Sequence, residues 1–262
     1  MPPAQQNGRS YTSRVAVIML LVLAAAVAAA YWLVYTRTQR PEHAGRDIIA
    51  DIRDRGLAHY WGDEPMDIRL ARRDGSGVRR WQREHEDGRY EGTFALDGRV
   101  QTAQAKWRLA ADMSTGRYES QGVYLRQGGL TKTTTEIVVD GRQIEVTSDG
   151  GRARATIPDN YIPEGTLHLV ARHVAQRGDR AAFSMILDGR SLSADGQVWF
   201  SSVIMTPLSP RRVRVRMASG TSSSISIIEF DDAGDVLRYT VVSADGASKE
   251  YVRVENRDRE SR

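Results

Sequence analysis

The chain opens with one long apolar run. Val15–Tyr35 (VAVIMLLVLAAAVAAAYWLVY) contains 21 residues without a charge, a proline or a glycine. A helix rises about 1.5 Å per residue, so this run spans about 31 Å, close to the hydrocarbon thickness of a bilayer. The pattern therefore predicts a single transmembrane helix at residues 15–35.

A cleaved signal peptide is the alternative for the same run. Arg9 and Arg14 would form its positive region, and Ala28–Ala30 would supply the small residues of a cleavage site. The flank before the run is long, however, and the apolar character continues past that site to Tyr35. The aromatic residues that end the run are also typical of a membrane interface. We favour a retained anchor.

The charges flanking the anchor bear on its orientation. Five arginines occur in the twenty residues after the run and two occur before it, which by simple counting places the C-terminal part in the cytoplasm. A long folded domain, however, translocates largely regardless of its charge. We expect residues 1–14 to be a cytoplasmic tail, residues 15–35 to cross the inner membrane of a bacterium, and the soluble domain to be extracytoplasmic.

Small residues recur within the anchor, for example at Ala24 and Ala28. Pairs at this spacing let two membrane helices approach closely and would support a homodimer. The plainer interpretation is that alanine is a good helix former.

Residues 36–61 form the passage from the anchor to the remainder of the chain. Thr36–Ala44 contains Pro41 and reads as a linker. Gly45–Tyr60 has apolar residues at close to i, i+4 spacing, which predicts a short amphipathic helix. Its polar face carries both signs of charge, so we expect it to pack on the domain instead of lying on a membrane surface.

From Met66 the pattern changes to short runs separated by turns. Asp-Gly pairs, which supply the positive φ angles of tight hairpins, occur at 74–75, 87–88, 97–98, 140–141, 149–150, 188–189, 195–196 and 245–246. Between them lie runs of β-branched and aromatic residues at Arg89–Leu96, Val100–Leu109, Arg117–Arg126, Thr133–Val139, Arg142–Thr147 and Arg152–Ile157. This spacing predicts an antiparallel meander.

A helix divides these strands from a second set. Thr166–Gln176 has apolar residues on one helical face, with Thr166 as N-cap and Gly178 as the stop. The second set is Ala181–Leu187, Gln197–Met205, Arg211–Met217, Ser224–Phe230, Val236–Val242 and Lys249–Val254.

About a dozen strands are more than a flat open sheet carries without curling. The predicted fold is therefore mainly β. A transmembrane helix precedes a curved antiparallel sheet (a half-barrel or a two-sheet domain) over residues 62–255, with an entry helix and one central helix. Residues 256–262 form a charged, frayed tail.

Composition excludes several classes. Apolar residues make up 40% and charged residues 27%, as in ordinary globular proteins. The net charge is +4, and two of these charges, Arg9 and Arg14, precede the anchor. The remainder is close to neutral, so we expect no nucleic-acid partner. The lack of cysteine excludes disulfides, thiolate zinc sites, thiol catalysis and an acylated N-terminal cysteine.

Histidines and carboxylates offer little catalytic chemistry. His168 and His173 are five residues apart on the predicted helix, so they do not share a face as a metal pair would. Glu164 lies four residues before His168, but one carboxylate and one imidazole do not by themselves make a site. The acidic stretch Arg83–Asp87 could bind a cation, although a strand end and turn explain it better.

Two further stretches have structural interpretations. Ser219–Ser226 matches neither the Gly-x-Ser-x-Gly pattern of a nucleophile elbow nor the Gly-Lys-Ser/Thr of a phosphate loop, and it reads as a hairpin connection. Arg211–Arg216 could meet anionic headgroups, but its alternation with valine is typical of a strand with one solvated face. We name no catalytic, cofactor-binding or metal residue, and we expect no cofactor and no enzymatic activity.

The order of anchor, meander, central helix and C-terminal hairpin Phe230–Val254 (FDDAGDVLRYTVVSADGASKEYVRV) resembles the LolA-like half-barrel envelope proteins and their membrane-anchored relatives. The resemblance covers roughly Gly62–Val254 and implies a curved sheet around a hydrophobic hollow partly closed by helices. The order of elements is also similar to that of LptC, an anchored periplasmic β-jellyroll that binds lipopolysaccharide. No motif of either group is matched, so no functional residue is carried over.

Three functions remain as hypotheses. The first is a membrane-tethered module that binds a lipid or lipoprotein, which requires an apolar hollow. The second is a structural component of an envelope complex, which requires a filled core and an exposed sheet edge. The third is a hydrolase that uses Glu164 and His168, which requires perturbed groups converging in one cleft.

Overall fold

The computed structural model describes residues 8–61, 66–84, 87–96, 99–126, 129–149, 151–187, 192–193, 195–220, 222–242 and 248–254. The chain divides into two compact units, Met1–Pro41 and Glu42–Arg262.

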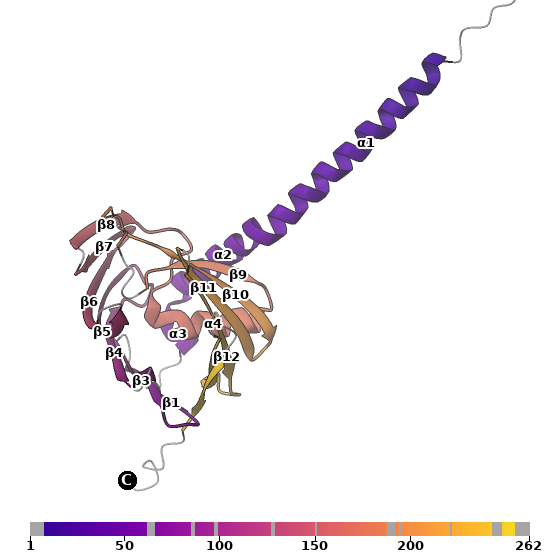
Figure 1. The fold of residues 1–262 in the computed structure, drawn as a ribbon. Helices are drawn as coiled ribbons and strands as arrows, with labels where there is room; N and C mark the ends of the chain where they lie inside the picture. The colour runs from indigo at the N-terminus through magenta and orange to yellow at the C-terminus, as the bar shows by residue number, and fades with distance from the viewer. Residues whose placement is uncertain are drawn as a thin grey trace, which may run out of the picture. The chain divides into compact units, whose positions relative to one another are not determined.

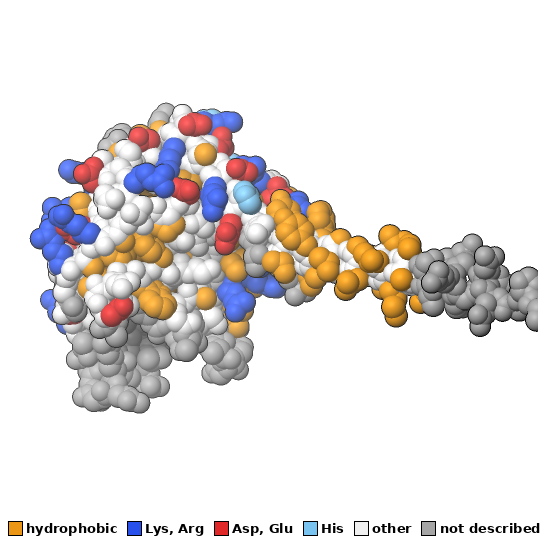
Figure 2. All heavy atoms as spheres, turned by 90° about the horizontal axis from the view of Figure 1, so that it is seen from above, with side chains coloured by type: hydrophobic (Ala, Val, Ile, Leu, Met, Phe, Trp, Pro, Cys, Tyr) orange, Lys and Arg blue, Asp and Glu red, His pale blue; other side chains and the backbone are white. Residues whose placement is uncertain are grey.

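The predicted apolar run is helical. It lies within α1 (Gly8–Val34), in which Val15–Val34 is long and apolar enough to cross a membrane. Figure 2 shows the apolar side chains along this helix, whereas basic and acidic side chains are mixed on the surface of the second unit. By length and composition, α1 suits either a membrane anchor or a signal sequence.

The predicted linker at residues 36–44 is wrong. A π-helical turn, Tyr35–Gln39, follows α1 directly, and α2 (Arg40–Arg55) follows that turn with no intervening loop. The N–H of Arg40 donates a hydrogen bond to the carbonyl oxygen of Tyr35. Pro41 lies in the first turn of α2, where its missing N–H is tolerated. The π-helical turn before it is wider than an α-helical turn and accommodates the backbone where proline cannot donate a hydrogen bond.

The predicted amphipathic helix exists but is broken in two. The three isoleucines of α2 are buried, as expected of its apolar face. The helix ends at Gly56, whose φ of +79° few other residues adopt, and whose N–H donates to the carbonyl of Ile52 at 2.8 Å. A short helix, α3 (Leu57–Trp61), then follows.

The rest of the described chain confirms a mainly β fold. The first group of strands is β1 (Met66–Arg72), β2 (Gly77–Glu84), β3 (Asp87–Leu96), β4 (Arg99–Leu109), β5 (Thr115–Arg126), β6 (Gly129–Asp140), β7 (Gln143–Ser148) and β8 (Gly151–Thr156). The second group is β9 (Ala181–Met185), β10 (Ser201–Ser209), β11 (Arg212–Ser219), β12 (Ser222–Phe230), β13 (Val236–Val242) and β14 (Ser248–Arg253).

These strands pair as two antiparallel meanders, β1–β8 and β9–β14. A short antiparallel ladder joins the first strand of one meander to the last strand of the other, with Leu70 opposite Arg253 and Arg72 opposite Tyr251. The result is a single sheet in the order β8-β7-β6-β5-β4-β3-β2-β1-β14-β13-β12-β11-β10-β9. It curves so that its two flanks face each other (Figure 1).

Register follows from alternation along each strand. On β11, Val213 and Val215 are buried while the arginines that alternate with them are exposed, which confirms the predicted half-buried strand. The predicted strand at Gln197–Met205 begins only at Ser201. A local turn takes up the preceding residues, since the N–H of Gln197 donates to the hydroxyl of Ser193 at 3.1 Å.

The central helix lies inside the curve of the sheet (Figure 1). A 3-10 turn, η2 (Glu164–Thr166), leads into α4 (Leu167–Arg177), which contacts β10, β11 and β12. The predicted stop is confirmed, because Gly178 has a φ of +76° and donates to the carbonyl of Val174. Thr166 stands at the helix start, but its hydroxyl donates to the carbonyl of Pro163 instead of capping the helix.

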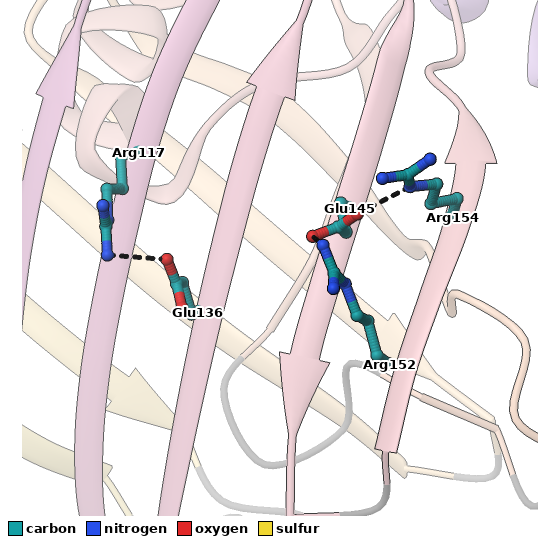
Figure 3. Close-up of polar contacts among 5 residues, drawn as sticks. All are labelled: Arg117, Glu136, Glu145, Arg152 and Arg154. Atoms are coloured by element: carbon teal, nitrogen blue, oxygen red, sulfur yellow. Dashed lines mark hydrogen bonds and ion pairs between the residues drawn. The ribbon is translucent and has the colours of Figure 1, made fainter.

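The face of the sheet opposite the core carries ion pairs. Figure 3 shows Arg117 of β5 paired with Glu136 of β6 at 2.8 Å, and Arg154 of β8 paired with Glu145 of β7 at 2.6 Å. Arg152 pairs with the same Glu145. The two arginines lower the pKa of the Glu145 carboxyl through hydrogen bonds. Exposed ion pairs of this kind add little to the free energy of unfolding. The main stabilisation therefore comes from the apolar side chains buried on the other face of the sheet.

Candidate functional site

A cavity of about 270 Å³ lies on the core side of the sheet. Its lining comes from β2, β4 and β5 of the first meander, from β9, β11, β12 and β13 of the second, and from η2 and α4. The volume is just below the range of about 300–1,000 Å³ that is usual for small-molecule sites.

Large apolar side chains supply much of the lining. They include Trp81 of β2, Trp107 of β4, Met185 of β9 and Met217 of β11. Methionine is flexible and polarizable, so its side chain adapts to ligands of irregular shape. The indole N–H of Trp107 is buried and has no hydrogen-bond partner among the described residues.

Gly165 allows η2 to lie against Trp107. A Cβ atom built on Gly165 would be 2.7 Å from two carbons of the indole ring, too close for any other residue without a shift. The close approach brings the flanking residue Glu164 to the cavity wall. There its carboxylate accepts a hydrogen bond of 2.7 Å from the hydroxyl of Tyr118.

His168 lines the same cavity from α4. Its ring meets Trp81 edge to face, with 4.6 Å between ring centroids. Burial, aided by the positive charge of Arg79, lowers the pKa of His168 to about 4. The imidazole is therefore neutral at pH 7, where it can donate one hydrogen bond and accept another.

Arg79 brings the positive charge to the lining. Its guanidinium carbon lies 4.8 Å from the ring centroid of Tyr239 and 4.7 Å from that of Tyr251. Aromatic faces stabilise a guanidinium in this position and hold it in place. The cavity thus combines apolar walls with one cation, one carboxylate and one neutral imidazole.

Two serines of β12 also face the cavity, and sequence reasoning missed them. Ser224 and Ser226 line it, and the hydroxyl of Tyr239 donates to the hydroxyl of Ser226 at 3.1 Å. The signal was present in the alternation SSSISIIEF of β12, but it was read as part of a hairpin connection. Among the described residues, no hydrogen bond joins either serine to His168, so no nucleophile–base pair is assembled here.

The structure brings Glu164 and His168, which the sequence analysis paired only in the hydrolase hypothesis, to one cavity. It places His173 apart from them, in a second hollow beside Asp51. Arg83 and Asp87 lie at the ends of β2 and β3, consistent with a strand end and turn; residues 85–86 lie outside the described part of the chain. No group of three or more potential metal ligands occurs among the described residues.

The comparisons with known proteins yield a few remote structural similarities. No protein-family model matches the sequence, and no curated protein matches it significantly. A β-barrel-like protein of domain family DUF1849 from Brucella abortus shares 10% identity, covers 72% of this chain and 93% of its own, and has a TM-score of 0.48. A DUF1089 family protein from Pseudomonas aeruginosa shares 14% identity over 62% of this chain and 88% of its own, with a TM-score of 0.38.

Neither of these two proteins is described as LolA-like or as LptC, so that resemblance stays a hypothesis. Similarities this remote carry no information on activity. The function must therefore be argued from the cavity itself.

Proposed function

We propose that this protein is a membrane-anchored binding module whose β domain holds the acyl chain of a lipid or lipoprotein. The observation that carries the proposal is the cavity on the core side of the sheet, with its walls of tryptophan and methionine. Burying an alkyl chain there gains about 0.8 kcal/mol for each CH₂ group removed from water. Because burial keeps His168 neutral at pH 7, the imidazole adds no charge to those of Arg79 and Glu164 at the wall.

The size of the cavity restricts the ligand. A volume of about 270 Å³ equals that of about nine molecules of liquid water, which is room for part of one chain and not for a whole phospholipid. Arg79 gives a polar or anionic end of the ligand a hydrogen-bonding partner at the wall. The ligand class that fits best is therefore an amphipathic molecule with a single alkyl segment.

The proposal places the chain in the inner membrane of a bacterium, with its N-terminus in the cytoplasm and the β domain outside. It rests on the length of Val15–Val34 and on the inference that this helix is retained. Mass spectrometry of the chain recovered from membranes tests retention, because cleavage after Ala30 would remove the first thirty residues. Protease added to intact spheroplasts tests sidedness, since only an external β domain is digested.

Fluorescence quenching by a brominated fatty acid tests the cavity directly. Bromine quenches a tryptophan only at contact, and Trp81 and Trp107 both line the cavity. The protein is the full chain in maltoside micelles with its other tryptophans replaced by phenylalanine, namely Trp32, Trp61 and Trp199. We expect saturable quenching at one fatty acid per chain.

A matched pair of variants on β12 separates the cavity from the surface. Ser224→Leu fills the cavity and should abolish the saturable quenching. Ser223→Leu adds the same apolar group to an exposed neighbour and should leave quenching intact. Equal quenching in both variants, or none in the parent chain, would exclude an acyl chain in this cavity.

A structural role in an envelope complex is the second candidate, and the edge of the sheet favours it. Strand β8 is the last in the order and pairs only with β7 among the described residues. The opposite edge is partly covered, because Ile162 donates to the carbonyl of Ser184 at 2.9 Å and Ser184 donates to that of Asn160 at 3.0 Å. An open edge can accept a strand from another protein.

Photo-crosslinking from Ala153 of β8 in intact membranes tests this second role. A discrete partner, lost when Arg154→Pro removes an N–H that points away from β7, would support a strand-addition complex. Crosslinks to lipid alone would favour the binding module.

A further inference from the structure

A second hollow, of about 470 Å³, lies among three helices. Helix α4 lines it through Leu169, Arg172, His173, Gln176 and Arg177, which recur at helical spacing along one face. Helix α2 contributes Asp51 and Arg55, and α3 contributes His59 and Tyr60. None of these residues lines the cavity of the proposed function, so the two sites can be tested separately.

The lining of this hollow is strongly basic. It contains three arginines and a single carboxylate, so its charge with both histidines neutral is positive. Arg55 pairs with that carboxylate, Asp51, at 2.8 Å. Within the described part of the chain, neither Arg172 nor Arg177 forms an ion pair. On the outer face of β5–β8, by contrast, Arg117, Arg152 and Arg154 all have glutamate partners (Figure 3).

The carboxylate of Asp51 already has hydrogen-bond donors of its own, so it does not neutralise Arg172 or Arg177. It accepts hydrogen bonds from the hydroxyl of Tyr60 and from Arg55, and these contacts lower the pKa of its carboxyl. Burial and the same hydrogen bond raise the pKa of Tyr60 to about 12, so the phenol stays a donor to Asp51.

Two imidazoles flank the phenol ring edge to face. The ring centroids of His59 and His173 lie 5.0 and 5.1 Å from that of Tyr60. The Nε2 atom of His173 is buried without a hydrogen-bond partner and lies 3.7 Å from Asp51, beyond hydrogen-bonding range.

The guanidinium of Arg172 lies against Gly234, where a Cβ atom would come within 1.9 Å of it.

We propose that this hollow binds a phosphate-class anion, either free phosphate or the phosphate of a lipid headgroup. Guanidinium groups present paired N–H donors that match phosphate oxygens, and Arg172 and Arg177 supply two of them from adjacent turns of one helix. The imidazoles of His59 on α3 and His173 on α4 also line the hollow and add donors to it. A volume of about 470 Å³ admits a phosphate ester as well as the inorganic ion.

Isothermal titration of the full chain in lipid-free maltoside micelles tests the proposal. The probes are inorganic phosphate and glycerol 3-phosphate, each in a phosphate-free buffer. We expect binding at one anion per chain. Similar affinity for both probes identifies a site for free phosphate, whereas at least tenfold tighter binding of glycerol 3-phosphate identifies a headgroup site.

Three variants locate the binding. The double variant Arg172→Gln/Arg177→Gln should weaken it at least tenfold. The matched control Arg180→Gln removes an exposed arginine just beyond the helix and should bind like the parent. Gln176→Glu keeps both arginines and places a carboxylate among them, so it should weaken binding even if the double variant folds poorly. Failure of both probes to bind, or equal affinity in Gln176→Glu and Arg180→Gln, would overturn the proposal.

Discussion

His168 should make the stability of the β domain depend on pH. Its ring lines the cavity together with the aromatic side chains of Trp81 and Tyr239, at centroid distances of 4.6 and 6.2 Å. Burial, aided by the charge of Arg79, lowers its pKa from 6.5 to about 4. The imidazole of His168 therefore binds a proton more weakly in the folded protein than in the unfolded chain.

The sign and size of the effect follow from proton linkage. Between pH 6.5 and 4 the unfolded chain carries a proton on His168 and the folded chain does not, so acid favours unfolding. The stability is fully present above pH 6.5 and falls progressively as the pH approaches 4. The whole effect amounts to about 3 kcal/mol, of which about 2 kcal/mol is lost by pH 5.

Urea unfolding of the full chain, followed by tryptophan fluorescence in maltoside micelles, measures this loss. The parent and His168→Gln are compared at pH 7.5 and pH 5, so the contributions of the carboxylates cancel. On acidification we expect the parent to lose about 2 kcal/mol more than the variant. His43→Gln, which removes an exposed histidine of α2, is the matched control. Equal losses in the parent and His168→Gln would refute the reasoning.

Two further predictions concern packing and surface charge. Gly165→Ala places a methyl group 2.7 Å from the indole of Trp107, and we expect it to lower the free energy of unfolding by about 1–3 kcal/mol, measured by urea denaturation. An unchanged urea midpoint would mean that η2 can shift at no cost. Glu145→Gln removes the shared partner of Arg152 and Arg154, and we expect a small loss of thermal stability at low salt that disappears at high salt. A large loss that persists in high salt would contradict this view of the surface.

The sequence determined the elements whose signals are local. The apolar run at residues 15–35 specified a helix by length and composition alone. Alternation and Asp-Gly turns located the strands from residue 89 onward, and Gly178 marked the end of α4. These features could be read without the fold because each depends on neighbours within a few residues.

Local signals failed where two local rules competed. Pro41 suggested a linker because proline cannot donate a backbone hydrogen bond. The π-helical turn before it accommodates this loss, and the chain stays helical. Gly56 lay inside an apparently continuous apolar pattern, yet its positive φ splits that pattern into α2 and α3.

Only the tertiary structure decided which residues form the cavity. Alternation on β12 shows that Ser224 and Ser226 share one face and Ile225 and Ile227 the other, but it does not say which face is inside. The serines face the cavity because the partner strands and α4 enclose that side of the sheet.

The same holds for Glu164 and His168. Their spacing on η2 and α4 was evident, but Tyr118, Arg79 and Trp81, which set their chemistry, are 46 to 89 residues away in the chain. Contacts over such distances depend on how the two meanders curve around the helix, and no local pattern encodes that curvature.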